Sequence, residues 1–252
     1  MSEFFSPSLR MALDGAISRL VHDLSSAPLA PDEERKRAIA KYRSARAQTI
    51  AIIEKLTPQQ VNFSAGGKAW SIGQNVEHLL LTETLYKTYM RSLIDLARKT
   101  GRDGGERNVT LTFAELDNSL ALIPRDVMPK LTLPLNALNA VMPRAIREAM
   151  FRFPLIPGVN PTASQPALTQ DIAELRSRAA SSLNSMEEIF SGNLPLNLMD
   201  MTLTHPVLGT NNVAQILGIL AAHEERHHLQ MRTILTNPRF PVRDGEERSS
   251  TI

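Results

Sequence analysis

Apolar residues recur at helical spacing along four separate stretches of the chain, and this pattern constrains the fold more than any other feature. The stretches run over about 31–57, 72–99, 167–190 and 211–235. A stripe of this kind gathers apolar side chains on one face of a helix, and that face is buried against other helices. The alternation typical of strands is weak. The sequence therefore predicts an all-α protein, most simply a four-helix bundle.

Local residues predict where the helices begin and end. Pro31 starts the first helix and Pro58 closes it. Ser71 is the expected N-cap of the second helix, with Gln74 as its capping-box partner. Leu168 is the first residue of the expected apolar stripe of the third helix. The expected inward-facing residues of the first helix are Ile39, Tyr42, Arg46 or Ala45, Thr49, Ile53 and Leu56.

Three further segments accompany the four bundle helices. An amphipathic stretch at 8–25 predicts an extra N-terminal helix that packs onto the domain. The segment 101–166 holds eight of the 16 prolines and is nevertheless apolar. It is expected to be a long packed insertion between the second and third bundle helices, forming a lid or an oligomer contact. The charged tail 243–252 is expected to be flexible, and 1–252 to form a single domain.

Composition excludes several classes of protein. The net charge of +2 gives no field that favours nucleic acid, so nucleic-acid binding is not expected. No apolar run approaches the roughly 18 residues of a membrane span. The chain has no cysteine, which excludes disulfides, thiolate zinc sites and cysteine nucleophiles. The first residues lack the features of a signal peptide, and a cytoplasmic protein is expected.

Histidines on the last helix carry the clearest chemical signal. His223 and His227 fall on its apolar stripe, and because they are one turn apart their imidazoles can converge on one ion. Burying two such rings without partners would cost on the order of 1–3 kcal/mol each. His228 is turned about 100° away and lies with Glu224 and Arg232 on a polar face, where it is expected to face solvent or to support a metal ligand from behind.

His78 is the candidate for a third imidazole. It lies among apolar residues of the second helix and, taken alone, fits a core histidine as well as a ligand. Together with His223 and His227 it completes a three-imidazole set from two helices. Such a set leaves at least one coordination position open, which is the pattern of catalytic metal sites. Zinc is the first expectation, and nickel, iron, manganese or cobalt also suit these ligands.

The same helix also matches H-E-x-x-H, with Glu224 between His223 and His227. In a zinc peptidase this glutamate is the general base. The context argues against a peptidase, because no sheet is expected before the helix. Gln230 also occupies the glycine position of the extended form H-E-x-x-H-x-x-G-x-x-H.

Three motifs together resemble the DinB-like (DinB/YfiT) superfamily. Residues 70–79 match a W-S-x-x-x-x-x-x-H-L entry to the second helix. Residues 205–209 are similar to its H-P-x-x-G loop, and residues 223–230 to its H-x-x-x-H-x-x-Q final helix. The resemblance covers roughly 31–100 and 165–237. The insertion is longer than the usual connection of the family, and the N-terminal residues are additional.

The resemblance implies a four-helix bundle in which three histidines bind a divalent metal near one end. His78, His223 and His227 match those ligands position by position. Characterised relatives include transferases and isomerases that use the thiols bacillithiol or mycothiol, and other members are classed as damage-inducible proteins or metal-dependent hydrolases. Relatives are often dimers, so the resemblance also implies a homodimer. The family is functionally mixed, so its fold does not fix a reaction.

The expected function is therefore a metal-dependent transfer of a low-molecular-weight thiol to an electrophilic small molecule. The alternatives are a metal-dependent hydrolase and a non-catalytic metal-binding stress or binding protein. Gln230 and Glu224 are the candidate catalytic residues. Glu224 and Glu77 could also orient imidazoles, although a solvated face or a pair with Arg226 is the simpler expectation. Trp70 is expected to anchor the core rather than wall the site, and His205 to serve a turn.

Overall fold

The computed structural model describes the helical part of the chain and a small sheet. The predicted helix at 8–25, most of the 101–166 insertion and the 243–252 tail lie outside the described residues, and those predictions stay predictions. The described residues are 31–67, 69–100, 109–112, 162–191, 201–205 and 209–242.

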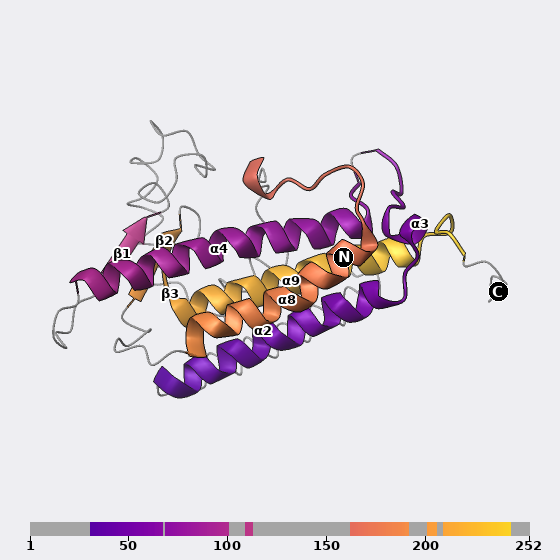
Figure 1. Ribbon diagram of the computed structural model, residues 1–252. Helices are drawn as coiled ribbons and strands as arrows, with labels where there is room; N and C mark the ends of the chain where they lie inside the picture. Colours follow the sequence, from indigo (N-terminus) through magenta and orange to yellow (C-terminus); the bar gives the residue numbers. More distant parts are fainter. Residues whose placement is uncertain are drawn as a thin grey trace, which may run out of the picture.

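Four long helices lie side by side along the length of the molecule (Figure 1). They are α2 (Pro31–Glu54), α4 (Ile72–Thr100), α8 (Ile172–Ser191) and α9 (Val213–Leu235). A short helix, α3 (Pro58–Val61), follows α2 at one end of the bundle. The predicted helical bundle is thus confirmed. Among the described helices, none is both long enough and apolar enough to cross a membrane.

The directions of α4 and α8 explain why the segment that connects them is long. Gln170, just before α8, donates a hydrogen bond from its side chain to Glu77 in the second turn of α4. The two helices therefore start at the same end and run parallel. A connection between parallel helices must return along the whole bundle, whereas antiparallel neighbours need only a short loop.

A three-stranded sheet lies at the end of the bundle opposite α3 (Figure 1). Strand β1 (Val109–Thr112) pairs in parallel with β2 (Met201–His205), which pairs antiparallel with β3 (Gly209–Asn212). His205 faces Gly209 in this register, so the H-P-x-x-G motif forms the β2–β3 connection. The expectation that no sheet precedes the last helix is thus wrong, because each strand spans only four or five positions and gives a weak periodic signal.

Capping boxes start two of the bundle helices. The predicted box of α4 is confirmed: the backbone N–H of Gln74 donates to Ser71 Oγ at 3.1 Å, and the backbone N–H of Ser71 donates to Gln74 Oε1 at 3.0 Å. A second box, which was not predicted, begins α9 with Asn212 as N-cap and Gln215 as its partner. Each box satisfies two backbone N–H groups that the helix itself leaves unpaired.

The third bundle helix begins later than predicted. The carboxylate of Asp171 accepts hydrogen bonds from the backbone N–H groups of Ala173 and Glu174 at 2.7 and 3.1 Å, so the helix starts at Ile172. Leu168, expected in its apolar stripe, is instead 88% exposed in the preceding loop. The prediction overlooked that Asp is a preferred N-cap residue.

Two apolar clusters fill the space between the four helices. The predicted inward face of α2 is confirmed except at Ile39 and Leu56, which are only partly buried. Close packing extends to the start of α4, where a Cβ atom added to Gly73 would lie 2.7 Å from Val61 Cγ1 and 2.9 Å from Gln170 Cβ. This contact brings α3 and the start of α8 against α4. The buried residues on the inward face of α2 are Ala38, Tyr42, Ala45, Arg46, Thr49 and Ile53.

Candidate metal centre

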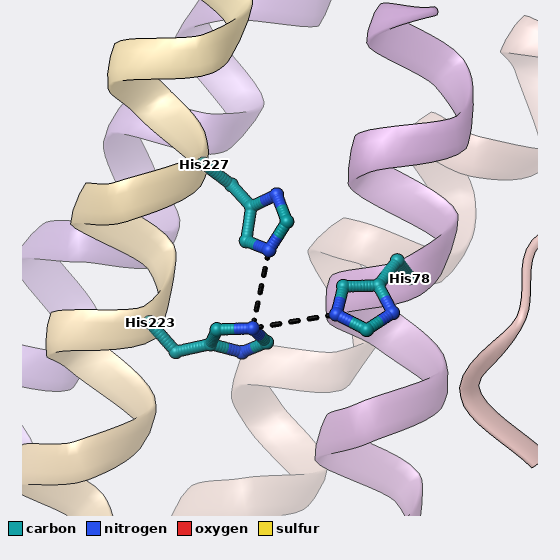
Figure 2. A group of neighbouring side chains, drawn as sticks. All are labelled: His78, His223 and His227. Atoms are coloured by element: carbon teal, nitrogen blue, oxygen red, sulfur yellow. Dashed lines mark hydrogen bonds between the residues drawn. The ribbon is translucent and has the colours of Figure 1, made fainter. Parts of the chain in front are cut away.

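Three histidines meet between α4 and α9. Figure 2 shows the His78 ring reaching from α4 toward the His223 and His227 rings of α9. The Nε2 atom of His223 lies 3.3 Å from Nε2 of His78 and 3.1 Å from Nε2 of His227. All three rings offer a ligand atom within 4.8 Å of the others. His78 and His227 are buried, while His223 is partly exposed and gives the cluster an accessible side.

Hydrogen bonds on the far side of two rings fix which nitrogen faces the cluster. The Nδ1 atom of His78 lies 2.7 Å from the backbone oxygen of Ser164, and a carbonyl oxygen only accepts, so Nδ1 carries the proton. The Nδ1 atom of His227 lies 2.7 Å from Asn75 Oδ1. The Asn75 amide is oriented by its own N–H group, which donates to the backbone oxygen of Ser71 at 2.8 Å. Both Nε2 atoms therefore present lone pairs.

These lone pairs make the cluster suited to a cation. In its neutral form His223 carries at most one proton on Nε2 and can donate it to His78 or to His227, so at least one lone pair of the cluster receives no hydrogen bond from the other rings. A divalent ion between the three nitrogens would bind all of them. Zinc bonds imidazole nitrogen at about 2.0–2.1 Å, which in a tetrahedron separates the nitrogens by about 3.3 Å. The two separations of 3.1 and 3.3 Å match this value.

The environment also keeps these imidazoles neutral, which is the form that binds metals. Burial lowers the pKa of His223 and of His227 well below the ordinary value of 6.5, and neighbouring histidines and Arg226 lower it further. Burial likewise lowers the pKa of His78, against the opposing effect of the hydrogen bond to Ser164. Near neutral pH, the three imidazoles therefore need not lose a proton before they bind a metal.

Trp70 forms a wall of this site. Its ring centroid lies 4.9 Å from that of His78, and it stacks on His227 at 6.2 Å with an interplanar angle of 14°. Its side chain is partly exposed. The sequence analysis expected Trp70 to anchor the core, and its position beside the histidine rings corrects that prediction. Packing against the rings restricts their rotation and covers one side of the cluster.

The prediction that Glu224 and His228 lie on a solvent-facing side of the helix is wrong. Both residues are buried, at 1% and 3% exposure. Thr49 of α2 donates a hydrogen bond to Glu224, and Nε2 of His228 lies 2.8 Å from the same hydroxyl oxygen. Nor does Glu224 pair with Arg226, because its ion pair is with Arg46 at 2.5 Å. Helix α9 packs against other helices on more than one face, so its polar stripe lies inside the bundle.

This placement argues against the H-E-x-x-H reading of α9. A general base must lie within hydrogen-bond reach of the reacting group. The Glu224 carboxylate is instead held by Arg46 and Thr49, on the side of α9 that faces α2. Gln230, the other candidate catalytic residue, is solvent-exposed. The contacts of the described residues therefore support the histidines as ligands but give neither candidate a catalytic contact.

A further residue of the sequence analysis, Glu77, lies beside the site. Glu77 accepts hydrogen bonds from the backbone N–H of Ala167, at 2.8 Å, and from the side chain of Gln170. It thereby holds the segment before α8, which includes Ser164, the partner of His78. The prediction of a freely solvated Glu77 is thus wrong. His205 ends β2, and its side chain lies outside the described ones.

A buried network of charges lies beside the metal centre and was not predicted. Arg46 of α2 contacts Glu83 of α4 at 2.6 Å and Glu224 of α9 at 2.5 Å, and Lys87 contacts Glu83 at 2.7 Å. Two cations and two carboxylates balance to zero net charge. Burial raises the pKa of Glu224, and Arg46 and Thr49 oppose this effect. The sequence did place Arg46 in an apolar stripe, which was the signal for a buried partner.

Asn75 is a residue that the sequence analysis missed. Replacing it by leucine would remove the acceptor that fixes the His227 ring and its tautomer. Partners of this kind contribute about 10- to 100-fold to metal affinity, so the Asn75→Leu protein should bind zinc more weakly by that factor. Competition with a chromophoric chelator measures the change. Asn75→Asp keeps an acceptor and should lose less; equal affinities of wild type and Asn75→Leu would contradict the assigned role.

Buried histidines should make the metal-free protein sensitive to acid. The pKa of His228 is lowered to about 4 by burial, and those of His223 and His227 are lowered as well. Between pH 6.5 and about 4 the unfolded chain binds protons that the folded chain does not, so the free energy of unfolding should fall as pH decreases.

The contribution of His228 to this loss is on the order of 3 kcal/mol, because one pKa unit corresponds to about 1.4 kcal/mol. Urea denaturation of the metal-free protein at several pH values between 4 and 7 measures it. A free energy of unfolding that stays constant over this range would show that these histidines are not held neutral.

Comparison with known proteins identified one family. The family model of the DinB superfamily matches residues 41–231 of the chain. This range includes all three histidines of the cluster and confirms the resemblance seen in the sequence. No match was found among curated proteins or among solved structures.

Proposed function

Because the chain belongs to the DinB superfamily, we propose that it is a divalent-metal-dependent enzyme that transfers a low-molecular-weight thiol to an electrophilic small molecule. The observation that carries the proposal is the convergence of three imidazole nitrogens from His78, His223 and His227. When bound there, a divalent metal such as zinc supplies Lewis acidity, which favours the deprotonated form of a thiol. Three protein ligands leave a position for a substrate atom, as in catalytic zinc sites.

The protein residues have distinct tasks in this proposal. His78 and His227 are held by Ser164 and Asn75, so their Nε2 atoms are fixed before any ligand binds. Trp70 covers one side of the cluster, which limits access of water. His223 is partly exposed and marks the side from which a substrate can approach.

The reaction proposed here opens an epoxide. The thiol sulfur forms a bond to an epoxide carbon while the bond from that carbon to oxygen breaks. The proton of the thiol ends on the released oxygen, so atoms and charge balance and no oxidant is required. The protein has no cysteine, so the nucleophilic sulfur belongs to the substrate and not to the chain.

Kinetic assays of the zinc-loaded protein test this proposal. Bacillithiol, mycothiol and L-cysteine would each be combined with an epoxide, and formation of the thioether would be followed by chromatography. The same preparation would be given p-nitrophenyl acetate. The expected result is thiol transfer by the wild type and none by His223→Ala. The His205→Ala protein, changed at a histidine that the sequence analysis assigns to a turn, should remain active.

The other two functions predict different results. Ester hydrolysis without thiol transfer would overturn the transferase and favour the hydrolase. Retention of metal with neither activity, together with a large loss of stability on metal removal, would indicate a non-catalytic structural site. Equal thiol transfer by wild type and His223→Ala would show that the histidine cluster is not the site of the reaction.

A further inference from the structure

Arg226 has no partner for its charge within the part of the chain that the structure describes. It lies on α9, one residue before His227, and its side chain is partly buried. Its Nε atom is buried without a hydrogen-bond partner. Because a buried donor that stays unpaired is costly, such a group in a native protein calls for an explanation.

Arg226 shares helix α9 with His223 and His227, two of the three histidines of the cluster. Its positive charge lowers the pKa of His78, of His223 and of His227. On the helix, Arg226 is three residues after His223, and residues at that spacing lie next to each other on one face. Arg226 therefore borders the metal centre.

The charge around the cluster is positive once a metal is bound. Three neutral imidazoles and a divalent ion carry two positive charges, and Arg226 adds a third. Glu224, the acidic residue next to His223 in the chain, is used by Arg46 and Thr49 in the neighbouring network. A site with this balance favours an anionic ligand, and the planar guanidinium fork matches the oxygen atoms of a carboxylate or a phosphate.

We propose that Arg226 anchors the substrate at the metal centre by binding an oxyanion, the carboxylate or phosphate group of a small molecule. This inference rests on the proposed function and narrows its substrate class to anionic compounds. The anion bound by Arg226 would hold the substrate while its reacting atom approaches the partly exposed His223 side of the cluster. Arg226 is thus a specificity residue and not a ligand of the metal.

Anion titrations of matched arginine variants test the inference. The visible spectrum of the cobalt-loaded protein would be followed as acetate or methylphosphonate is added, and calorimetry would repeat both titrations on metal-free protein. Arg226→Met should weaken binding by about 10- to 100-fold, because charge-assisted bidentate hydrogen bonds are the stronger class. Arg232→Met is the control, since Arg232 is exposed on the same helix. Metal content and thermal melting would show that each variant is folded and loaded.

The possible results separate this inference from the proposed function. Loss of anion binding in Arg226→Met, with Arg232→Met unchanged and Arg226→Lys intermediate, supports it. Equal anion affinity of Arg226→Met and the wild type would overturn it while the metal site stands, and so would a wild type that binds neither anion at millimolar concentration. If the wild type takes up no metal, the proposed function fails. In that case, calorimetry compares the anion affinities of the metal-free wild type and metal-free Arg226→Met. A weaker affinity of the variant supports the role of Arg226, and an equal affinity overturns it.

Discussion

The substitution His78→Ala is expected to reduce the metal content of the purified protein from about one ion per chain to none. His78 is the ligand that comes from α4, whereas the other two come from α9. The two remaining imidazoles form an incomplete site. The affinity for the metal should therefore fall by the large contribution that one ligand makes. Elemental analysis of untagged protein prepared without chelators measures the effect.

The control for this experiment is His205→Ala. His205 belongs to β2, and the sequence analysis assigns it to a turn rather than to the ligand set. Its substitution should leave the metal content unchanged. If neither the wild type nor the variants hold metal after incubation with zinc, nickel and manganese, the cluster is not a metal site. Equal metal content in wild type and His78→Ala would show that α4 supplies no ligand.

The substitution Arg46→Met is expected to lower the free energy of unfolding by about 3–5 kcal/mol, the usual result of breaking a buried ion pair. It would leave the carboxylates of Glu83 and Glu224 facing each other in the core, with Lys87 as the remaining cation of the network. Urea denaturation of the metal-free proteins isolates this effect from metal binding. The matched control is Arg43→Met on the same helix.

Arg43 pairs with Glu187 at 2.7 Å, but its side chain is 55% exposed, so its loss should cost less than about 1 kcal/mol. A similar small cost for Arg46→Met would contradict the role of the buried network. The variant Arg46→Met combined with Glu83→Gln and Glu224→Gln removes the uncompensated charges. It should recover part of the lost stability, because the penalty comes mainly from buried charges without partners.

These two substitutions should affect different properties. The Arg46 network ties α2, α4 and α9 together without a metal ion, so the metal-free protein is expected to remain folded near neutral pH. The histidine cluster lies beside the network but draws its fixed geometry from Asn75 and Ser164. His78→Ala should therefore remove the metal with little unfolding, and Arg46→Met should reduce stability while folded molecules still bind metal.

The sequence alone determined the helices and the ligand candidates, because both depend on local spacing. Apolar periodicity marked the four bundle helices, and the Ser71 capping box placed the start of α4 correctly. The four-residue spacing put His223 and His227 on one face of a helix, and the place of His78 among apolar residues of the second helix made it the third candidate. The family match over 41–231 bears out that resemblance.

Only the tertiary structure decided which polar residues face the site and which lie inside the bundle. Periodicity assigns a helix one buried stripe, but α9 packs on several faces, so Glu224 and His228 turned out to be buried. The partners that orient the histidines come from elsewhere: Ser164 precedes α8 and Asn75 belongs to α4. Such contacts join residues far apart in the chain, and no local pattern encodes the distance between them. That Arg226 has no partner among the described residues became visible for the same reason, since a missing partner is recognised from the positions of the neighbouring residues.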